Sequence, residues 1–270
     1  MERSIYATMK KDEKKLLLKH LKIKHPRLAL VHEYIRECHT SLEISEVPKC
    51  ALITGPTGVG KSVALHTYVD NYKKVYLEKN RTRQTILCAE VRSPASLMSF
   101  LETLLEQLND PYPMRGTLTV KRKKVEKFIK ECGIELILLD EFQNLTKASK
   151  PQANYEVSEC FKSLVNSTGV PFVLFGHEQE SNEIVDCNPQ LKRRFSLRCR
   201  VSEFRFDSPQ HMMEFEKLLH QIDTSLPFET LSDLAQSDIA KRIFVATNGL
   251  IDSVFKIIRD AAKYAIEKDK

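Results

Sequence analysis

Gly55-Pro-Thr-Gly-Val-Gly-Lys-Ser62 decides the fold. The stretch matches the pattern Gly-x-x-x-x-Gly-Lys-Ser/Thr in full, and its glycines allow successive backbone N–H groups to point at a phosphate. An apolar run precedes it at 50–54, and residues with helical periodicity follow it to Tyr72. Strand, loop and the positive end of a helix together make a phosphate-binding unit. We predict a P-loop that binds a nucleotide; the competing interpretation is a glycine-rich turn that binds nothing.

Each part of this loop has an expected role. Lys61 is expected to reach the β- and γ-phosphates and so to take part in catalysis, while the Ser62 hydroxyl binds Mg²⁺. The nucleotide, ATP in this interpretation, is expected to contact the whole loop, which comprises Gly55, Pro56, Thr57, Gly58, Val59, Gly60, Lys61 and Ser62.

Glu135-Leu-Ile-Leu-Leu-Asp-Glu141 is the second nucleotide motif. A buried strand that ends in a carboxylate can hold magnesium, and a second carboxylate can orient and deprotonate the water that attacks the γ-phosphate. We assign the magnesium to Asp140 and the water to Glu141, against the alternative that Glu141 is only a solvated strand end. We expect a parallel sheet to bring this strand beside the strand that precedes the P-loop.

Three further residues are candidates for the same site. The apolar run 171–176 ends at His177, where a polar side chain can sense the γ-phosphate; an ordinary surface histidine is the alternative. Arg193 and Arg194 are candidates for an arginine finger that stabilises transition-state charge in a neighbouring subunit's site. Their alternatives are a solvated basic turn or a DNA contact.

The order of elements indicates an α/β protein. Strand patterns alternate with helical patterns between 48 and 206, which predicts a central, mostly parallel sheet flanked by helices. Residues 1–47 are predicted to be an N-terminal helical collar, 48–206 the nucleotide-binding core, and 207–270 a small C-terminal helical lid. Seven cysteines without a Cys-x-x-Cys pair indicate a reducing compartment, and neither a signal peptide nor a membrane span is expected.

Positive charge is concentrated in one segment. Residues 115–130 hold seven Lys or Arg against one Glu, as much net charge as the +6 of the whole chain. A predicted helix covers most of this segment, and its polar face carries no interleaved aromatic side chains for base stacking. The segment therefore favours contacts with the backbone of a polyanion, without sequence readout; a solvated helix face is the alternative.

With both nucleotide motifs placed, the chain resembles the AAA+ ATPases of the TnsC/TniB type, target-site regulators of DNA transposons. It is more distantly similar to MuB and to helicase-loader ATPases. The resemblance covers about residues 28–265, and besides the P-loop it rests on Leu138-Leu-Asp-Glu-Phe-Gln-Asn-Leu145, Val173-Leu-Phe-Gly176, Leu191-Lys-Arg-Arg-Phe195 and Ala246-Thr-Asn-Gly-Leu-Ile251.

The resemblance implies an ATPase that assembles on double-stranded DNA as a hexamer or helical filament and recruits a transposase, with a target-selection protein as a further candidate partner. Such a protein is expected in the bacterial cytoplasm, associated with the nucleoid. By matching position, Arg194 is favoured as the finger. His177 replaces the usual small polar sensor, and Ser253 stands where an arginine often follows the glycine of the lid. The expected contacts with the DNA backbone are Arg115, Lys121, Arg122, Lys123 and Lys124.

Two rival functions are compatible with the same motifs. A replication-type helicase loader uses the same core but prefers single strands. A small-molecule kinase with a P-loop needs neither an oligomer nor DNA, but it needs an acceptor pocket, and no residues in the sequence indicate one.

Overall fold

The computed structural model describes residues 3–21, 23, 25–44, 46–78, 81–93, 95–145 and 151–268. The chain divides into two compact units. The sheet unit comprises Arg27–Thr57 and Lys61–Val201, and the helical unit comprises Met1–Pro26, Gly58–Gly60 and Ser202–Lys270. Within the described residues, no helix is both long enough and apolar enough to cross a bilayer.

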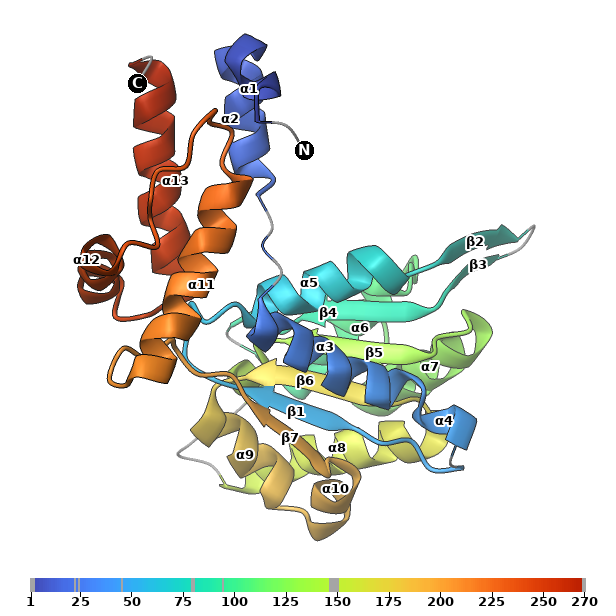
Figure 1. Cartoon of the computed structure of the whole chain (residues 1–270). Helices are drawn as coiled ribbons and strands as arrows, with labels where there is room; N and C mark the ends of the chain where they lie inside the picture. The colour runs from blue at the N-terminus through green and yellow to red at the C-terminus, as the bar shows by residue number, and fades with distance from the viewer. Residues whose placement is uncertain are drawn as a thin grey trace. The chain divides into compact units, whose positions relative to one another are not determined.

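The sheet unit is built on five parallel strands in the order β4-β5-β6-β1-β7 (Figure 1). The predicted α/β class with a mostly parallel sheet is confirmed. Strand β5 is buried along its whole length, as a strand covered on both faces must be. The strands are β1 (Ala51–Thr54), β4 (Ile86–Glu90), β5 (Leu136–Asp140), β6 (Phe172–Gly176) and β7 (Leu197–Arg200).

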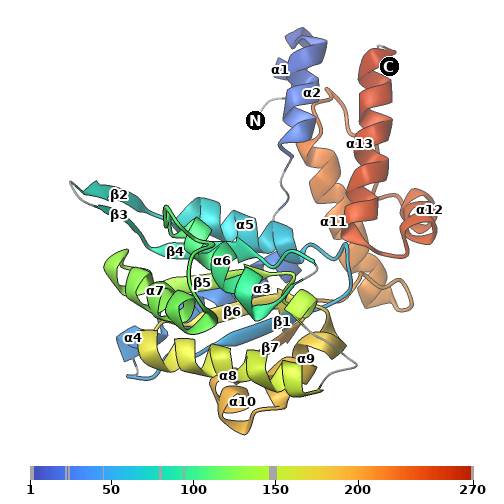
Figure 2. The ribbon, with the colours of Figure 1, turned by 180° about the vertical axis from the view of Figure 1, so that it is seen from behind.

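Helices cover both faces of this sheet. One face carries α3 and α5, which are joined by a hydrogen bond between His32 Nε2 and the Ala64 carbonyl (2.9 Å) (Figure 1). The other face carries α6, α7 and α8, which come to the front in Figure 2. The helices of this unit are α3 (Pro26–His39), α4 (Ser41–Ile44), α5 (Lys61–Tyr72), α6 (Leu97–Gln107), α7 (Leu118–Glu131), α8 (Pro151–Thr168), α9 (Glu178–Asp186) and α10 (Pro189–Arg194), with the 3-10 helix η1 at Phe142–Leu145.

The strand order corrects one expectation. Strand β6 lies between β1 and β5, so the strand that ends in Asp140 is not a direct neighbour of the P-loop strand. The register pairs Leu139 with Leu174 and Thr54 with Gly176. Because parallel strands end at the same edge, the residues that follow β1, β5 and β6 still gather at the C-terminal edge of the sheet.

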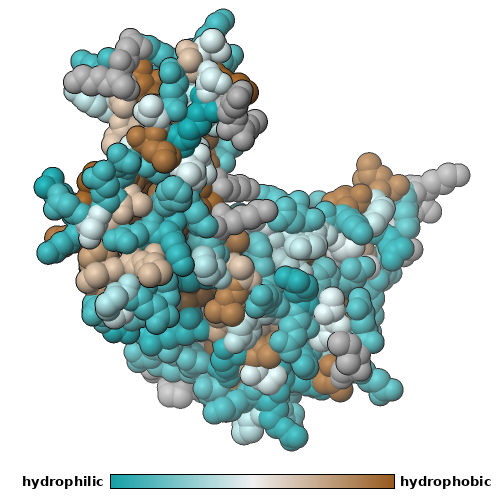
Figure 3. Space-filling model, in the orientation of Figure 1, coloured by the Kyte–Doolittle hydropathy of each residue, from teal (hydrophilic) through white to brown (hydrophobic). Residues whose placement is uncertain are grey.

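A two-stranded antiparallel hairpin was not predicted. It consists of β2 (Val75–Glu78) and β3 (Arg81–Gln84), between α5 and β4. Every residue of β2 is exposed, and Leu77 reaches 87%. Apolar side chains are accordingly visible on this hairpin in Figure 3. Because β2 buries none of its residues, it has no apolar face to mark it as a strand in the sequence.

The helical unit contains α1 (Ile5–Thr8), α2 (Lys11–Lys19), α11 (Pro209–Ser225), α12 (Ser237–Thr247) and α13 (Ile251–Glu267). Ser208 caps α11 by accepting a hydrogen bond from the His211 N–H. Its core joins Leu18 of α2 to the buried faces of α11 and α13. The predicted collar at 1–47 is therefore divided, because α2 packs with the C-terminal helices while α3 belongs to the sheet unit.

Candidate nucleotide site

The P-loop has the backbone that its glycines predict. Gly58 and Gly60 have φ values of +82° and +93°, which residues with a Cβ rarely adopt. Helix α5 begins at Lys61, so its free N–H groups follow the loop directly. The Lys61 ammonium donates to the carbonyls of Gly55 (2.7 Å) and Pro56 (2.9 Å), which folds the side chain back along the loop.

Lys61 is a buried cation, 7% exposed. Burial lowers the pKa of its ammonium below the usual value, because desolvation disfavours the charged form. The carboxylates of Asp140 and Glu141 act in the opposite direction and raise that pKa. These three charged groups, from α5 and from the end of β5, therefore lie within electrostatic reach of one another.

Asp140 and Ser62 fit the magnesium role. Asp140 is 6% exposed, and its Oδ1 accepts the Glu141 N–H at 2.9 Å. In the described part of the chain, neither Asp140 Oδ2 nor the Ser62 hydroxyl has a hydrogen-bond partner. Oxygen ligands of this kind are the ones Mg²⁺ takes in nucleotide sites. The two residues thus offer free oxygens where the sequence predicts the ion.

Glu141 leaves the strand with an unusual backbone. Its φ is +55°, a conformation that few residues other than glycine adopt. Phe142 and Leu145, which follow it, are buried, and the Asn144 side chain donates to the Val91 carbonyl at 2.7 Å. The turn after β5 is therefore anchored on both sides, and the strained residue is the one expected to position water.

His177 lies beside the P-loop. Its Nε2 is 3.1 Å from the Thr57 hydroxyl, and its backbone N–H donates to Gln143 Oε1 at 3.1 Å. Gln143 in turn donates from Nε2 to Glu141 Oε2 at 2.6 Å. Sequence reasoning did not single out Gln143; the available signal was a long amide two residues after the catalytic carboxylate.

Arg193 and Arg194 lie at the other end of the strands. Helix α10, which carries them, ends just before β7 begins, and the Arg194 carbonyl accepts the Cys50 N–H that precedes β1. The P-loop follows β1, at its opposite end. Arg194 donates from Nη2 to Asn166 Oδ1 at 2.9 Å, and Arg193 is exposed. Neither arginine is brought to the P-loop edge of its own chain.

The five expected DNA contacts differ in exposure. Lys121 is 1% exposed, and its ammonium donates to Glu102 Oε1 (2.7 Å) and to the Pro113 carbonyl (2.9 Å). Burial and two partners withdraw its charge from the surface, which argues against the predicted contact. The Lys124 ammonium is ion-paired with the buried carboxylate of Asp110 and is only partly exposed.

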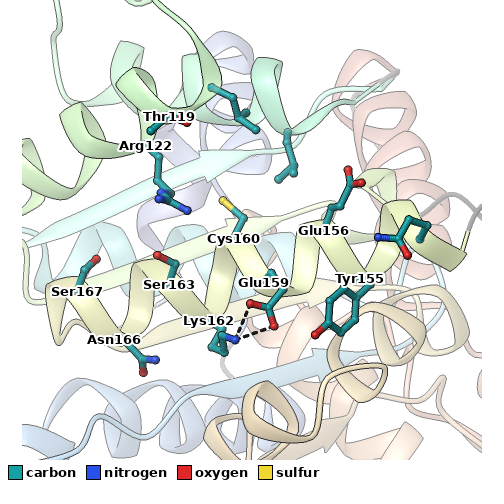
Figure 4. A pocket seen from close by; sticks show the side chains of 13 residues that line it. Thr119, Arg122, Tyr155, Glu156, Glu159, Cys160, Lys162, Ser163, Asn166 and Ser167 are labelled. Atoms are coloured by element: carbon teal, nitrogen blue, oxygen red, sulfur yellow. Dashed lines mark hydrogen bonds and ion pairs between the residues drawn. The ribbon is translucent and has the colours of Figure 1, made fainter.

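Arg122 lines a cavity and is partly exposed. The cavity measures about 790 Å³ and lies between the start of α7 and helix α8 (Figure 4). Arg122 Nε is 3.7 Å from Glu126 Oε1, and the carboxylates of Glu156 and Glu159 line the opposite wall. No residue of the P-loop lines this cavity. Because its two cations, Arg122 and Lys162, lie beside carboxylates of Glu126 and Glu159, the cavity does not match a triphosphate.

Lys123 and Arg115 are the two expected contacts that remain on the surface. Lys123 is exposed on α7. Arg115 is exposed before α7, with its guanidinium 4.3 Å from the centre of the Tyr112 ring. Stacking of this kind orients a guanidinium and leaves its N–H donors available.

The geometry and the motif order agree with one family of known proteins. The family model for the bacterial TniB protein matches residues 17–204, more than half of the chain. The chain belongs to this family. No curated protein matches the chain significantly.

Solved structures show the same fold at low sequence identity. The Orc1 protein of Aeropyrum pernix, solved in complex with DNA, has a TM-score of 0.62 and 14% identity over 95% of this chain. The Cdc6p protein of Pyrobaculum aerophilum gives 0.58 and 17% over 83%. The TniB-family chain spans 65% and 57% of these two proteins. Domain III of the Thermotoga maritima replication initiation protein DnaA gives 0.55 and 15%, with 92% of this chain and 88% of that domain covered.

Family and fold together identify a TniB-family chain with a P-loop and the AAA+ fold. The alternative of a small-molecule kinase receives no support from either. The separation of the P-loop and the two arginines at opposite ends of the sheet unit is the feature that bears most on function.

Proposed function

We propose that this TniB-family chain hydrolyses ATP while it is assembled with copies of itself on double-stranded DNA. The assembly recruits or activates a transposase and thereby regulates DNA transposition. The observation that carries the proposal is the position of Arg194, at the opposite end of the sheet from the P-loop of its own chain. A site that one chain leaves without a finger is completed by a second chain.

Such a contact joins two different surfaces, the P-loop edge of one copy and α10 of the next. Head-to-tail contacts of this type close into rings or continue into helical filaments. Turnover then depends on assembly, because an arginine finger supplied from outside stabilises the transition state by about 10³-fold or more. DNA on which several copies assemble therefore raises the rate of ATP hydrolysis without contacting the nucleotide.

Within one site the residues divide the work. Lys61 and the loop amides bind the phosphates. Ser62 and Asp140 would hold Mg²⁺, which would supply positive charge that neutralises the phosphates. Glu141 accepts a proton from the attacking water. His177, beside Thr57, is positioned to respond to the terminal phosphate.

The DNA contact is assigned to the exposed cations near α7. Lys123 and Arg115 reach solvent, with Arg122 and Lys124 beside them in partial exposure. Point charges of this kind bind phosphates without reading bases and give a salt-dependent affinity. The structure of Orc1, which has this fold, was solved in complex with DNA, and this supports the proposed DNA binding. Lys121 is left out because it is buried.

A binding measurement in three arms tests the proposal. Fluorescence anisotropy is recorded on duplex and single-stranded DNA of equal length, with a slowly hydrolysed ATP analogue, with ADP, and without nucleotide. We expect binding to the duplex that requires the ATP analogue, and electron microscopy of that sample should show rings or filaments. Preference for the single strand would favour a helicase loader. A monomer in every arm would contradict the proposed assembly.

A further inference from the structure

One amide side chain connects the ends of two strands at the nucleotide site. Gln143 donates from Nε2 to Glu141 Oε2 at 2.6 Å and accepts the His177 N–H on Oε1 at 3.1 Å. Glu141 follows β5 and His177 follows β6. Because His177 Nε2 also lies 3.1 Å from the Thr57 hydroxyl, three hydrogen bonds, joined through the covalent frames of His177 and Gln143, link the P-loop to the Glu141 carboxylate.

The backbone around Gln143 is shaped to allow this bridge. A Cβ at Gly176 would lie 2.8 Å from Gln143 Oε1 and would also collide with the Ser181 hydroxyl. Only glycine therefore lets the amide pass over the end of β6. On the other side, the buried Phe142 and the bond from Asn144 to the Val91 carbonyl hold the turn that presents Gln143.

The carboxylate at one end of the bridge belongs to a strained residue. Glu141 has a φ of +55°, a backbone conformation that is strained for a residue with a side chain. A strained backbone holds its side chain in place only where neighbours define the position. Gln143 is the one described side chain that hydrogen-bonds to the Glu141 carboxylate, so it is the neighbour that sets the orientation.

We propose that Gln143 is a positioning residue that couples the P-loop to the orientation of the Glu141 carboxylate. This inference rests on the proposed ATPase function and adds a regulatory element to the same site. When a γ-phosphate changes the contact between Thr57 and His177, Gln143 carries the change to Glu141. Gln143 touches neither the water nor the nucleotide.

The step that depends on this orientation is the attack of water. The water oxygen forms a bond to the γ-phosphorus, and the bond from that phosphorus to the β,γ-bridging oxygen breaks, with its electron pair leaving on ADP. The water proton passes to the Glu141 carboxylate. A carboxylate turned away from the water slows this step and leaves the binding of ATP unchanged.

Two substitutions of similar volume separate the ends of the bridge. Gln143→Met removes both hydrogen bonds, whereas Gln143→Glu keeps the acceptor for the His177 N–H and loses the donor to Glu141. We expect each to lower kcat by about 10-fold or more, as supporting residues of this kind do, with KM and the Kd for ATP within about twofold. Gln221→Met, on an exposed face of α11, is the matched control and should leave all three values unchanged.

The rates are measured with and without duplex DNA, so that two failures can be told apart. If duplex DNA does not raise the ATPase rate of the wild-type protein, the proposed function is contradicted. The ratio of the variant's kcat to that of the wild type tests Gln143 with or without DNA. An unchanged kcat in Gln143→Met overturns the inference. A Kd that rises in parallel with the fall in kcat also overturns it, because that result shows a general distortion of the loop. Gln143→Met should add nothing to the loss caused by Glu141→Gln.

Discussion

At the C-terminal edge of the sheet, charged side chains are buried and lie near partners of opposite charge, whereas along α7 several of them face solvent. Lys61 and Asp140 are almost inaccessible, and their mutual interaction appears in the opposing influences on the pKa of Lys61. On α7, Lys123 is exposed while Lys121, two residues earlier, is fully buried. The first region concentrates charge for chemistry at one point; the second distributes it over a surface.

This difference teaches that a run of like charges has no single role. Lys121 and Lys123 lie two residues apart in one basic stretch, yet a helix turns each residue by about 100° from the last, so they point in different directions. The buried member holds α7 to Glu102 and the exposed member is available to a polyanion. Burial, and not the charge itself, separates a structural cation from a binding one.

The largest effect is expected at the water-positioning carboxylate. Glu141→Gln should lower ATP turnover by about 10³-fold while the Kd for ATP stays within a few fold, because the amide cannot accept the proton. Turnover is measured by phosphate release and affinity by titration with a fluorescent ATP analogue. Glu135→Gln, at the exposed start of the same strand, is the control and should behave as wild type. Unchanged turnover in Glu141→Gln would show that another residue positions the water.

Substitution of the proposed arginine finger, Arg194, should reduce ATP turnover nearly as much, and mixing two variants tests this role. Arg194→Ala should lower turnover by about 10²-fold or more, since the transition-state charge loses its external partner. An equal mixture of Arg194→Ala and Glu141→Gln proteins should regain activity, because one subunit's Glu141 can meet the other's Arg194. Arg193→Ala is the comparison variant. If a mixture of Arg193→Ala with Glu141→Gln regained activity and the mixture with Arg194→Ala did not, Arg193 would be the finger.

Lys121 and Lys123 should differ most in their effect on stability. Lys121→Met should lower the free energy of unfolding by about 2 kcal/mol, because Glu102 loses its ion-pair partner in a largely buried position. Lys123→Met should change it by less than about 0.5 kcal/mol, as exposed substitutions do. Urea unfolding of both variants gives the comparison. Equal stabilities would contradict the structural role of Lys121.

For DNA binding, Lys123→Met should have the larger effect and Lys121→Met the smaller one. Lys123→Met should weaken duplex binding about threefold and reduce the slope of log K against log salt by about 1, since one phosphate contact is lost. Lys121→Met, measured at a temperature where it remains folded, should keep the wild-type slope. Anisotropy titrations at several salt concentrations provide the slopes. If only Lys121→Met reduced the slope of log K against log salt, the phosphate contact would have to be assigned to Lys121 and not to Lys123.

The smallest effect is a pH dependence of nucleotide affinity. Burial lowers the pKa of Lys61, so its ammonium is lost at lower pH than for an exposed lysine, and the attraction to phosphates is lost with it. The affinity for ATP should therefore fall by about twofold between pH 7.5 and 9.5. Because Glu141 raises the pKa of Lys61, Glu141→Gln should shift this fall to lower pH. A constant affinity across this range would contradict the assignment.

Much of the site could be predicted because its motifs are local. The P-loop and the Asp140-Glu141 pair each depend on a few consecutive residues whose roles follow from residue type and from the end of a strand. The hairpin β2–β3 could not be predicted in the same way, because β2 buries none of its residues.

The sequence by itself determined the α/β class, the nucleotide chemistry and its principal residues, because glycine backbones, helix starts and carboxylates at strand ends act over short distances. Only the tertiary structure decided that β6 separates β1 from β5, that Lys121 is buried, and that Gln143 joins Glu141 to His177. Each of these depends on which distant segments pack together, and packing is a property of the whole core that no short stretch of residues encodes.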